Sequence, residues 1–295
     1  MNAQQSIKTT RPPTGASADA ATLTAAHTQH RRPWGTVIAT VVLAAWILVA
    51  LFWTHLAPYN PQAQDLTARF VPPGGHHLLG TDQFGRDTLS RLMAGAGTVL
   101  LVAPLATVLA LIVGTVLGLL AGTMGRWLDE VIMRILDAVL VFPAIIATII
   151  CVAMLGHSAT AVVLVVGSSF IPLVTRSVRA ATLVERRKPY AEAALLRGEP
   201  IWSLMTRELL PNIAGTVLVE ATSRLGDAIF AVATLSFLGL GQPPGSPDWG
   251  TAVSDNRAWL QNAPWTVLAP ALAIASLVIC VALISDDVRA RWDSR

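Results

Sequence analysis

The chain has 295 residues and a formal net charge of +3; 53% of its residues are hydrophobic and only 13% are charged. Ordinary soluble domains carry roughly a quarter charged residues, so this composition leaves too little polar surface to cover a soluble globule. The apolar residues also form long blocks instead of short alternating runs, as a bilayer requires. Both cysteines, Cys151 and Cys280, lie inside such blocks, which argues against a disulfide framework or a zinc site.

The N-terminal end combines a polar tail with a first apolar block. Residues 1–33 are rich in Ala, Thr, Ser and Pro, lack apolar periodicity, and are predicted to be a disordered tail. Residues 34–54 carry no charge and are long enough to cross a hydrocarbon core of about 30 Å, so they are predicted to be the first transmembrane helix. A cleaved signal peptide would have a shorter apolar region and a small-residue cleavage site, so an uncleaved anchor is favoured.

Five further spans are predicted in a core over residues 92–285. After a polar loop over 55–91, residues 92–125 are uncharged and long enough for one span. Residues 138–175 are also uncharged and too long for one span, and Gly156-His157-Ser158 supplies a turn, so two spans are predicted there. The other segments are a charged connector over 126–137, a polar segment over 176–208, a fifth span over 210–236, a loop over 237–263, a sixth span over 264–285 and a tail over 286–295. The predicted fold class is an all-α membrane protein with about six transmembrane helices.

The distribution of positive charge orients this bundle. Six spans place both termini on one side of the membrane, together with the 126–137 connector and the 176–208 segment. Sixteen Lys and Arg residues lie on that side, and four lie on the other, namely Arg69, Arg86, Arg91 and Arg257. The positive-inside rule therefore predicts that both termini and the 176–208 segment are cytoplasmic and that the 55–91 loop is extracytoplasmic.

The chain contains no motif that could hydrolyse ATP. Its only lysines, Lys8 and Lys188, do not follow a glycine, so a phosphate-binding G-x-x-x-x-G-K-[S/T] loop is excluded. No H-E-x-x-H or C-x-x-C metal pattern occurs, and no recognisable set of residues indicates a membrane-embedded enzyme. The pair His76-His77 is interpreted as a solvated loop pair, because adjacent side chains point apart. No cofactor is expected in this chain, and any ATP hydrolysis would need another chain.

The 176–210 segment has the pattern of a short helix, a turn and a second helix. Residues 191–197 are strong helix formers. Gly198 is a natural helix stop, and Pro200 suits the first turn of a second helix. Pro211 lies where that second helix would pass into the fifth span.

This segment resembles the E-A-A-x-x-x-G-x(9)-x-x-L-P loop of binding-protein-dependent ABC permeases. In that family the loop forms a coupling helix that docks into a cleft on the ATPase subunit. The resemblance assigns ATPase coupling to a set of loop residues: Tyr190, Glu192, Ala193, Ala194, Gly198, Leu210 and Pro211. It also implies that the small side chains of Ala193 and Ala194 allow a close approach. Glu208 departs from the family pattern, which often has an aliphatic residue there.

Three other stretches resemble the dipeptide, oligopeptide and nickel branch of this family. Residues 77–91 fit the pattern H-x-L-G-T-D-x-x-G-R-D-x-x-S-R. Residues 128–143 are similar to the third span of that branch, and residues 235–265 are similar to the loop before its last span. The likeness covers about residues 55–295, in order and with nearly unbroken spacing.

The resemblance implies a type I ABC importer fold and a non-catalytic inner-membrane subunit that forms half of a translocation pathway. Its implied partners are a second homologous permease, two cytoplasmic ABC ATPases that bind the ATP and magnesium, an extracytoplasmic substrate-binding protein and membrane lipid, but no nucleic acid. The implied substrate is a di- or oligopeptide, and import of nickel or a metal chelate stays open as an alternative. A secondary transporter driven by an ion gradient is a further alternative, disfavoured because no inverted repeat is found.

Three charged residues lie deep in the fifth span. Glu220, Arg224 and Asp227 are spaced i, i+4 and i+7, so they share one face of a helix. At 1.5 Å per residue from Leu210, Glu220 lies about 15 Å into the span, where each charge costs roughly 2.5–3.5 kcal/mol, which disfavours contact with lipid. Two interpretations stay open: an ion-paired packing stripe against a neighbouring helix, or the lining of a water-filled path that meets the charged ends of a zwitterionic substrate.

Overall fold

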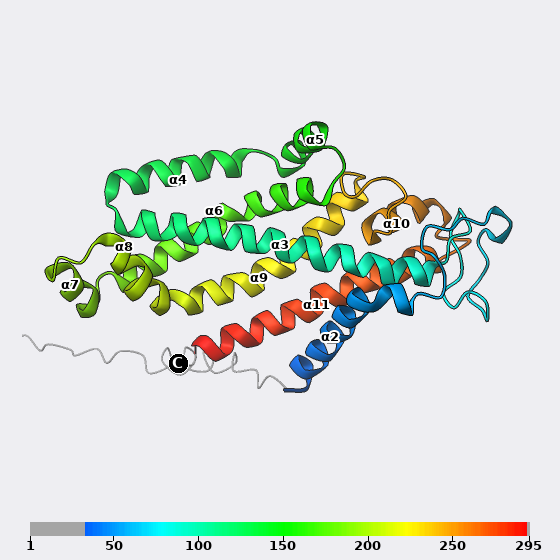
Figure 1. The fold of residues 1–295 in the computed structure, drawn as a ribbon, viewed down its shortest axis with the longest axis horizontal. Helices are drawn as coiled ribbons and strands as arrows, with labels where there is room; N and C mark the ends of the chain where they lie inside the picture. Colours follow the sequence, from blue (N-terminus) through cyan, green and yellow to red (C-terminus); the bar gives the residue numbers. More distant parts are fainter. Residues whose placement is uncertain (1–32, 294–295) are drawn as a thin grey trace, which may run out of the picture. The chain divides into compact units, whose positions relative to one another are not determined.

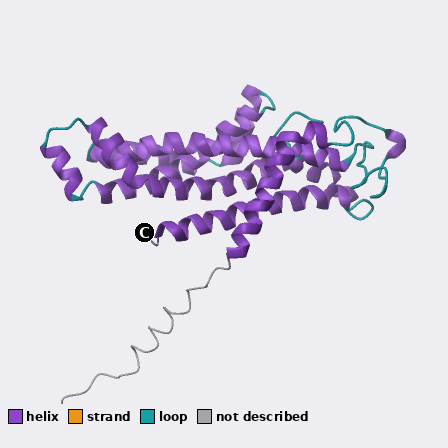
Figure 2. Ribbon diagram, turned by 60° about the horizontal axis from the view of Figure 1, so that its bottom comes forward, coloured by secondary structure: helices purple, strands orange, loops and turns teal. Residues whose placement is uncertain are grey.

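The structure, a computed structural model, describes residues 33–293. Within this range the regular elements are helices, and Thr81 and Asp87 form an isolated antiparallel bridge. Figure 2 shows helices joined by loops throughout the described part of the chain. The predicted all-α fold class is confirmed. The predicted tail over 1–33 lies outside the described residues, apart from Pro33.

Seven long helices are joined by short helical segments in this part of the chain. The long helices are α2 (Pro33–Leu56), α3 (Thr88–Thr123), α4 (Arg126–Val141), α5 (Ala144–Leu155), α6 (Ala159–Glu185), α9 (Leu210–Phe237) and α11 (Trp265–Asp293). The short segments are η1 (Leu66–Ala68), α7 (Pro189–Leu196), α8 (Ile201–Ser203), η2 (Leu204–Leu209), α10 (Trp249–Asn256) and η3 (Arg257–Trp259). In Figure 1, α3, α6, α9 and α11 run alongside one another, with α7 and α8 near one end of these helices and α10 near the other.

The number of helices suited to a membrane matches part of the predicted topology. Four helices, α2, α3, α6 and α11, are long and apolar enough to cross a membrane. The pair α4 and α5 qualifies only when taken together, with a bend of 88° at the break between them, where Pro143 has no N–H to continue the helix. Helix α9 has 28 residues and contains Glu220, Arg224 and Asp227. The described residues therefore form a multi-pass membrane protein, and α9 as a further span stays a prediction.

Several helices extend beyond their predicted boundaries. The 126–137 connector is the first part of α4, and the 176–208 segment begins inside α6, which continues to Glu185. The tail over 286–295 belongs to α11 as far as Asp293. The helices can extend past the predicted spans because charge marks the edge of a membrane, whereas an α-helix needs only its own backbone hydrogen bonds to continue.

The N-terminal ends of two helices are set by aspartate caps inside predicted loops. Asp87, in the predicted 55–91 loop, accepts a hydrogen bond from the Ser90 N–H at 2.8 Å, so α3 begins at Thr88. Asp248, in the predicted 237–263 loop, accepts one from the Thr251 N–H at 3.1 Å, so α10 begins at Trp249.

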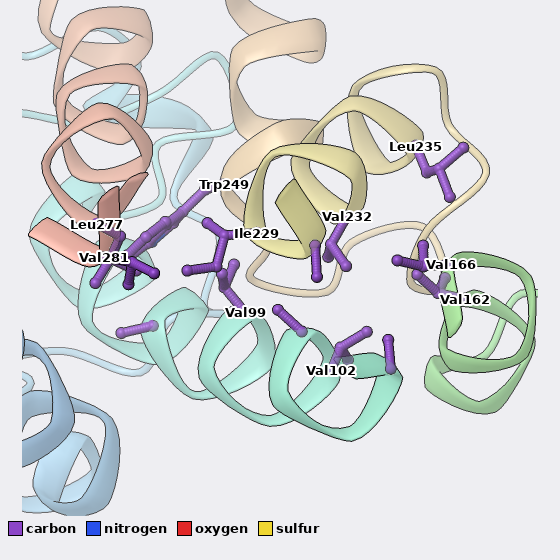
Figure 3. Close-up of a cluster of buried hydrophobic side chains, with 14 of the residues drawn as sticks. Val99, Val102, Val162, Val166, Ile229, Val232, Leu235, Trp249, Leu277 and Val281 are labelled. Carbon is purple, nitrogen blue, oxygen red and sulfur yellow. The ribbon is translucent and has the colours of Figure 1, made fainter. Parts of the chain in front are cut away.

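The largest apolar cluster joins four helices around α3. Figure 3 shows valines from α3 and α6 pointing toward Ile229 and Val232 of α9, with Leu277 and Val281 of α11 and the ring of Trp249 beside them. Helix α2 is attached to this cluster by Trp46, whose Nε1–H donates to Ser276 Oγ at 2.9 Å and whose ring meets Trp249 edge-on at 4.9 Å. The cluster therefore holds α2, α3, α6, α9 and α11 together.

Helices α3 and α6 approach closely along three glycines. A Cβ atom placed on Gly114, Gly118 or Gly122 would lie 2.6–2.7 Å from side-chain atoms of α6. The facing residues are Val174, Val178 and Thr182. Small residues one turn apart let membrane helices approach until their backbones are in van der Waals range, which is the main source of their attraction in lipid.

The outward faces of the long helices are apolar and exposed. On α2, Val37, Ile38, Val41 and Leu51 are each more than half exposed. Exposed apolar patches of this extent are unfavourable in water but match a hydrocarbon environment. This pattern supports the assignment of the chain to a membrane.

We expect Gly118→Ala to destabilise the protein by about 1–3 kcal/mol, because the new methyl group overlaps Val178 and Thr175 in a close-packed contact. The thermal unfolding temperature in mild detergent measures the effect. Gly97→Ala on the same helix is the matched control, since its Cβ would meet its nearest atom, the Ala50 carbonyl oxygen, at an ordinary 3.7 Å. Equal unfolding temperatures for the two variants would contradict the close contact.

Candidate functional site

Helix α7 covers most of the predicted helix-forming stretch over 191–197 and begins two residues earlier, at Pro189. Pro189 occupies the first turn, where its missing N–H leaves no helical hydrogen bond unmade. Gly198 has φ of +73°, the left-handed conformation that favours glycine. Its N–H donates to the Leu195 carbonyl at 3.0 Å, and the Glu199 N–H donates to the Ala194 carbonyl at 3.2 Å. These bonds satisfy the last carbonyls of α7 and terminate the helix.

The two faces of α7 differ in character. Ala191 and Ala194 are fully buried in an apolar cluster with residues of α3, α6, η2 and α9. Glu192 is exposed, and Leu196 is 89% exposed at the end of the helix. Ala194 therefore packs against the chain's own core, and its assignment to ATPase coupling stays a prediction.

The exposed leucines of α7 were missed by the sequence analysis. Leu195 is 40% exposed and Leu196 is 89% exposed. The sequence did contain a clue to these residues: two consecutive leucines, Leu195 and Leu196, lie between the alanines and Gly198 in a short polar segment. A motif that fixes only Glu, Ala, Ala and Gly gives these two positions no weight.

Tyr190 connects α7 to the end of α6. Its hydroxyl donates to Glu185 Oε2 at 2.8 Å, and Lys188 Nζ donates to Glu185 Oε1 at 2.7 Å. Burial, followed by the hydrogen bond to Glu185, raises the pKa of Tyr190 to about 12. The phenol therefore stays protonated at physiological pH and keeps donating this bond.

A π-helical turn, η2, leads from the loop into α9. Leu204, Met205 and Leu209 of this turn are buried beside Ala191 and Ala194. Leu210 begins α9, and Pro211 lies in its first turn. Proline has no N–H, so it is best tolerated in the first turn of a helix, where that N–H would have no partner in the helix. Pro211 therefore suits the point where the π-helical turn η2 ends and α9 begins. The loop residues named by the sequence motif thus lie along one continuous path from α6 to α9.

The three charged residues of α9 form one ion-paired group. Arg224 Nε lies 3.1 Å from Glu220 Oε2, and Arg224 Nη1 lies 2.7 Å from Asp227 Oδ2. Their side chains are 20%, 13% and 53% exposed, for Arg224, Glu220 and Asp227 respectively. The predicted shared face is confirmed. Both carboxylates pair with the single guanidinium of Arg224. Asp227 has the largest exposed fraction of the three side chains, so its carboxylate is the most accessible charge of the group.

Contacts from two other helices surround this ion-paired group. The guanidinium carbon of Arg224 lies 6.0 Å from the centre of the Phe170 ring on α6. Ser223 Oγ lies 3.1 Å from Ser285 Oγ on α11, which also donates to Thr222 Oγ1 at 3.1 Å. The polar groups of α9 therefore meet both neighbours, in partial agreement with the packing interpretation.

Two ion pairs between α4 and α6 were not anticipated from the sequence. Arg176 pairs with Asp137, and Arg179 pairs with Asp129. Each pair joins residues about 40 to 50 positions apart in the sequence, so it depends on how α4 packs against α6. They fasten α4 to the part of α6 that extends beyond the predicted span.

The 77–91 segment forms a buried ionic network at the end of α3. Arg86 Nε lies 2.7 Å from Asp82 Oδ2, and both side chains are about 95% buried. Arg91 donates to the carbonyl oxygens of Pro61 at 3.1 Å and Ser246 at 3.0 Å, so it joins two loops that are far apart in sequence. The ion pair and the hydrogen bonds offset the desolvation cost of burying these charged groups.

The two adjacent histidines have different environments. His76 is exposed, whereas His77 is half-buried, with Nδ1 2.9 Å from Asp87 Oδ1. The interpretation as a solvated pair is therefore wrong for His77, which helps to hold the aspartate cap of α3. Across residues 33–293, no group of three or more His, Cys, Asp and Glu side chains is placed to hold a metal ion.

Comparisons with known proteins match most of the chain. The family described as "Binding-protein-dependent transport system inner membrane component" matches residues 114–293. A putative peptide transport system permease protein of Brucella suis is 38% identical over 273 residues, covering 92% of this chain and 91% of that protein. The dipeptide transport system permease protein DppC of Escherichia coli K12 is 38% identical over 271 residues, covering 90% of each chain. DppC of Alkalihalophilus pseudofirmus is 34% identical, covering 88% of this chain and 85% of its own.

One solved structure has a similar fold. An inward-facing structure of the MetNI methionine ABC transporter matches with a TM-score of 0.57 and 18% identity. The match covers 68% of this chain and 95% of that one. At this identity the similarity concerns the fold alone, and it agrees with the predicted importer-type arrangement of helices.

We expect Gly198→Ala to loosen the end of α7, because a Cβ in the left-handed conformation costs about 1 kcal/mol. No other atom lies within 4 Å of that Cβ, so the effect is one of backbone conformation only. Hydrogen exchange of the α7 amides should become several-fold faster. Gly198→Asn is the control and should change exchange less, since asparagine tolerates this conformation. Equal exchange rates in both variants would contradict the account.

Proposed function

The chain belongs to the family of binding-protein-dependent transport system inner-membrane components, and on that premise we propose that it is the permease subunit of an ATP-driven peptide importer. The observation that carries the proposal is the form of the α7 loop. A short helix is seated on the helix bundle by Ala191 and Ala194 and presents Glu192 and Leu196 outward. A subunit that receives force from another chain needs such an exposed contact with a buried attachment.

The proposal assigns the remaining functions to partner chains. Two cytoplasmic ATPase subunits would bind ATP and magnesium and carry out the hydrolysis, leaving this chain without a catalytic role. A substrate-binding protein would deliver the solute from outside the membrane. A second permease of similar sequence would complete the pathway, because one bundle provides only one wall of a pore. The positive-inside rule places α7 and both termini on the cytoplasmic side.

Coupling requires two global states and a contact that differs between them. In this proposal the ATPases close on ATP and pull α7, together with the α6 end and η2. The hydrogen bond from Tyr190 to Glu185 and the burial of Leu204, Met205 and Leu209 would transmit that pull to α6 and α9. The long helices would then tilt and expose the pathway to the other side.

Peptides are the proposed substrates because the relatives described above carry peptide and dipeptide transport names. Nickel or a metal chelate is the second candidate, supported only by the resemblance of the 77–91 segment to the wider branch. Uptake assays with labelled dipeptides, longer peptides and nickel, in cells lacking this chain, separate these substrates.

The ion-paired group of α9 is the proposed lining of the pathway. Its motivation is the 53% exposure of Asp227 in a helix whose environment disfavours a lipid-facing charge. Arg224 is already held by two carboxylates, so the accessible charge is negative. This group would therefore favour the cationic end of a peptide over its carboxylate end.

We expect Leu196→Asp to reduce the amount of ATPase that copurifies with this chain by about tenfold, because an exposed apolar contact would become a desolvated charge. The measurement is subunit stoichiometry after purification in mild detergent. Leu66→Asp is the matched control: Leu66 is 65% exposed but lies in the 55–91 loop, on the opposite side in the predicted topology. Full ATPase retention by the Leu196→Asp variant would overturn the assignment of α7.

Neutralising the α9 group should separate the two interpretations of its charges. We expect Asp227→Asn to lower peptide uptake by about tenfold, or ~1.4 kcal/mol, while the assembled complex is recovered unchanged. Glu130→Gln on α4, a 65% exposed carboxylate paired with Arg126, is the control. Unchanged uptake would exclude the pathway interpretation, and loss of assembly would favour packing.

A further inference from the structure

A small cavity with both polar and apolar lining residues lies where α3, α10 and α11 meet. It has an internal volume of about 20 Å³ and is lined by Thr88 and Arg91 of α3, Ala252 and Asn256 of α10, and Thr266 of α11, with Asp248 at its edge. One water molecule needs roughly 10–15 Å³. The cavity is therefore the size of a single water.

Two polar atoms in this cavity lack a hydrogen-bond partner among the described residues. They are the hydroxyl oxygen of Thr88 and the amide oxygen of Asn256, in residues that are 7% and 2% exposed. The Asn256 nitrogen is engaged, because it donates to the Ala252 carbonyl at 2.8 Å. Buried polar atoms without partners are rare in folded proteins, and an ordered water is the usual way in which they are satisfied.

The other polar groups around the cavity are already paired. Trp249 Nε1–H donates to the Leu92 carbonyl at 2.8 Å, and Thr266 Oγ1 donates to the Ala263 carbonyl at 2.7 Å. Asp248 accepts from Ser236 Oγ at 3.0 Å and caps α10. The unmet hydrogen-bonding capacity is thus one hydroxyl that can donate and one carbonyl that accepts, which a single water can satisfy together.

From this geometry we infer a binding site for one ordered water molecule that bridges Thr88 of α3 and Asn256 of α10. The water accepts a hydrogen bond from the Thr88 hydroxyl and donates one to the Asn256 amide oxygen. It joins α10 to the same turn of α3 that Asp87 caps and Arg91 anchors. The water bridge thereby connects the loop over 237–263, which contains α10, to the loop over 55–91 and the first turn of α3.

Charge favours water over a metal cation at this position. The cavity lining already contains a buried cation, Arg91, whose Nε lies 3.9 Å from Asp82 Oδ2, and that carboxylate is also paired with Arg86 at 2.7 Å. Burial raises the pKa of Asp248, which shows that its site disfavours charge. A cation in this cavity would lie beside the buried guanidinium of Arg91, and two like charges in a buried site are unfavourable.

The decisive variant is Ala252→Val, which adds two methyl groups to the cavity. Filling a dry cavity raises stability, whereas displacing a bound water leaves Thr88 and Asn256 without partners. We therefore expect the unfolding temperature of the full chain in detergent to fall by about 2–4 °C. A rise in the unfolding temperature overturns the inference.

A double-mutant cycle excludes a purely steric effect of the added methyl groups. Thr88→Val and Asn256→Ala should each lower the unfolding temperature, and the double variant should lower it by clearly less than the sum, because the water is lost once. Thr107→Val is the matched control, since that buried hydroxyl of α3 donates within its own helix to the Ala103 carbonyl at 2.9 Å. It should combine additively with Asn256→Ala. Additivity of Thr88→Val and Asn256→Ala, or stabilisation by sodium over choline at constant ionic strength, overturns the inference.

Discussion

The close contact between α3 and α6 is the interaction on which the rest of the bundle depends. Lipid offers no hydrophobic driving force between helices, so their association relies on van der Waals contact at short range. Gly114, Gly118 and Gly122 provide that range by letting Val174, Val178 and Thr182 lie against the α3 backbone. Helix α9 packs on the surface that α3 and α6 form together. Helices α11 and α2 pack against the same apolar cluster, around Trp249. Without this contact neither the α7 loop nor the α10 end would have a common support.

The α7 loop packs against α3 and α6 at the end of these helices that lies away from α10 (Figure 1). Ala191 and Ala194 belong to an apolar cluster that includes Val174 and Val178, which also face the glycines of α3. A displacement of α7 therefore acts directly on the α3–α6 contact and, through η2, on the start of α9. The proposed coupling needs no separate transmission pathway, because the seat of the loop and the core of the bundle share side chains.

The sequence was sufficient for the elements that depend on local chemistry. The apolar blocks, the Gly198 stop and the shared face of Glu220 and Asp227 are properties of residues near one another in the chain. The errors concern tertiary contacts. The contact of His77 with Asp87, the packing of Ala194 against the chain's own core and the pairing of Arg179 of α6 with Asp129 of α4 all depend on how distant segments meet. Pro143 indicates that the helix is interrupted between α4 and α5, but the sequence does not give the direction in which α5 turns away from α4.

The placement of charge separates rigid regions from regions able to make new contacts. At the α10 end, Asp82, Arg86 and Arg91 are buried and paired, and a buried pair is costly to break because it leaves an uncompensated charge. At the α7 end, Glu192 and Leu196 are exposed, and the burial that fixes the helix comes from apolar side chains, which can slide over one another at lower cost. Asp227, between these ends, is an accessible carboxylate on a paired group. In the proposed coupling, the buried end would keep the helices in register, the exposed end would be pulled by a partner, and the polar surface between them would change its neighbours as the helices tilt.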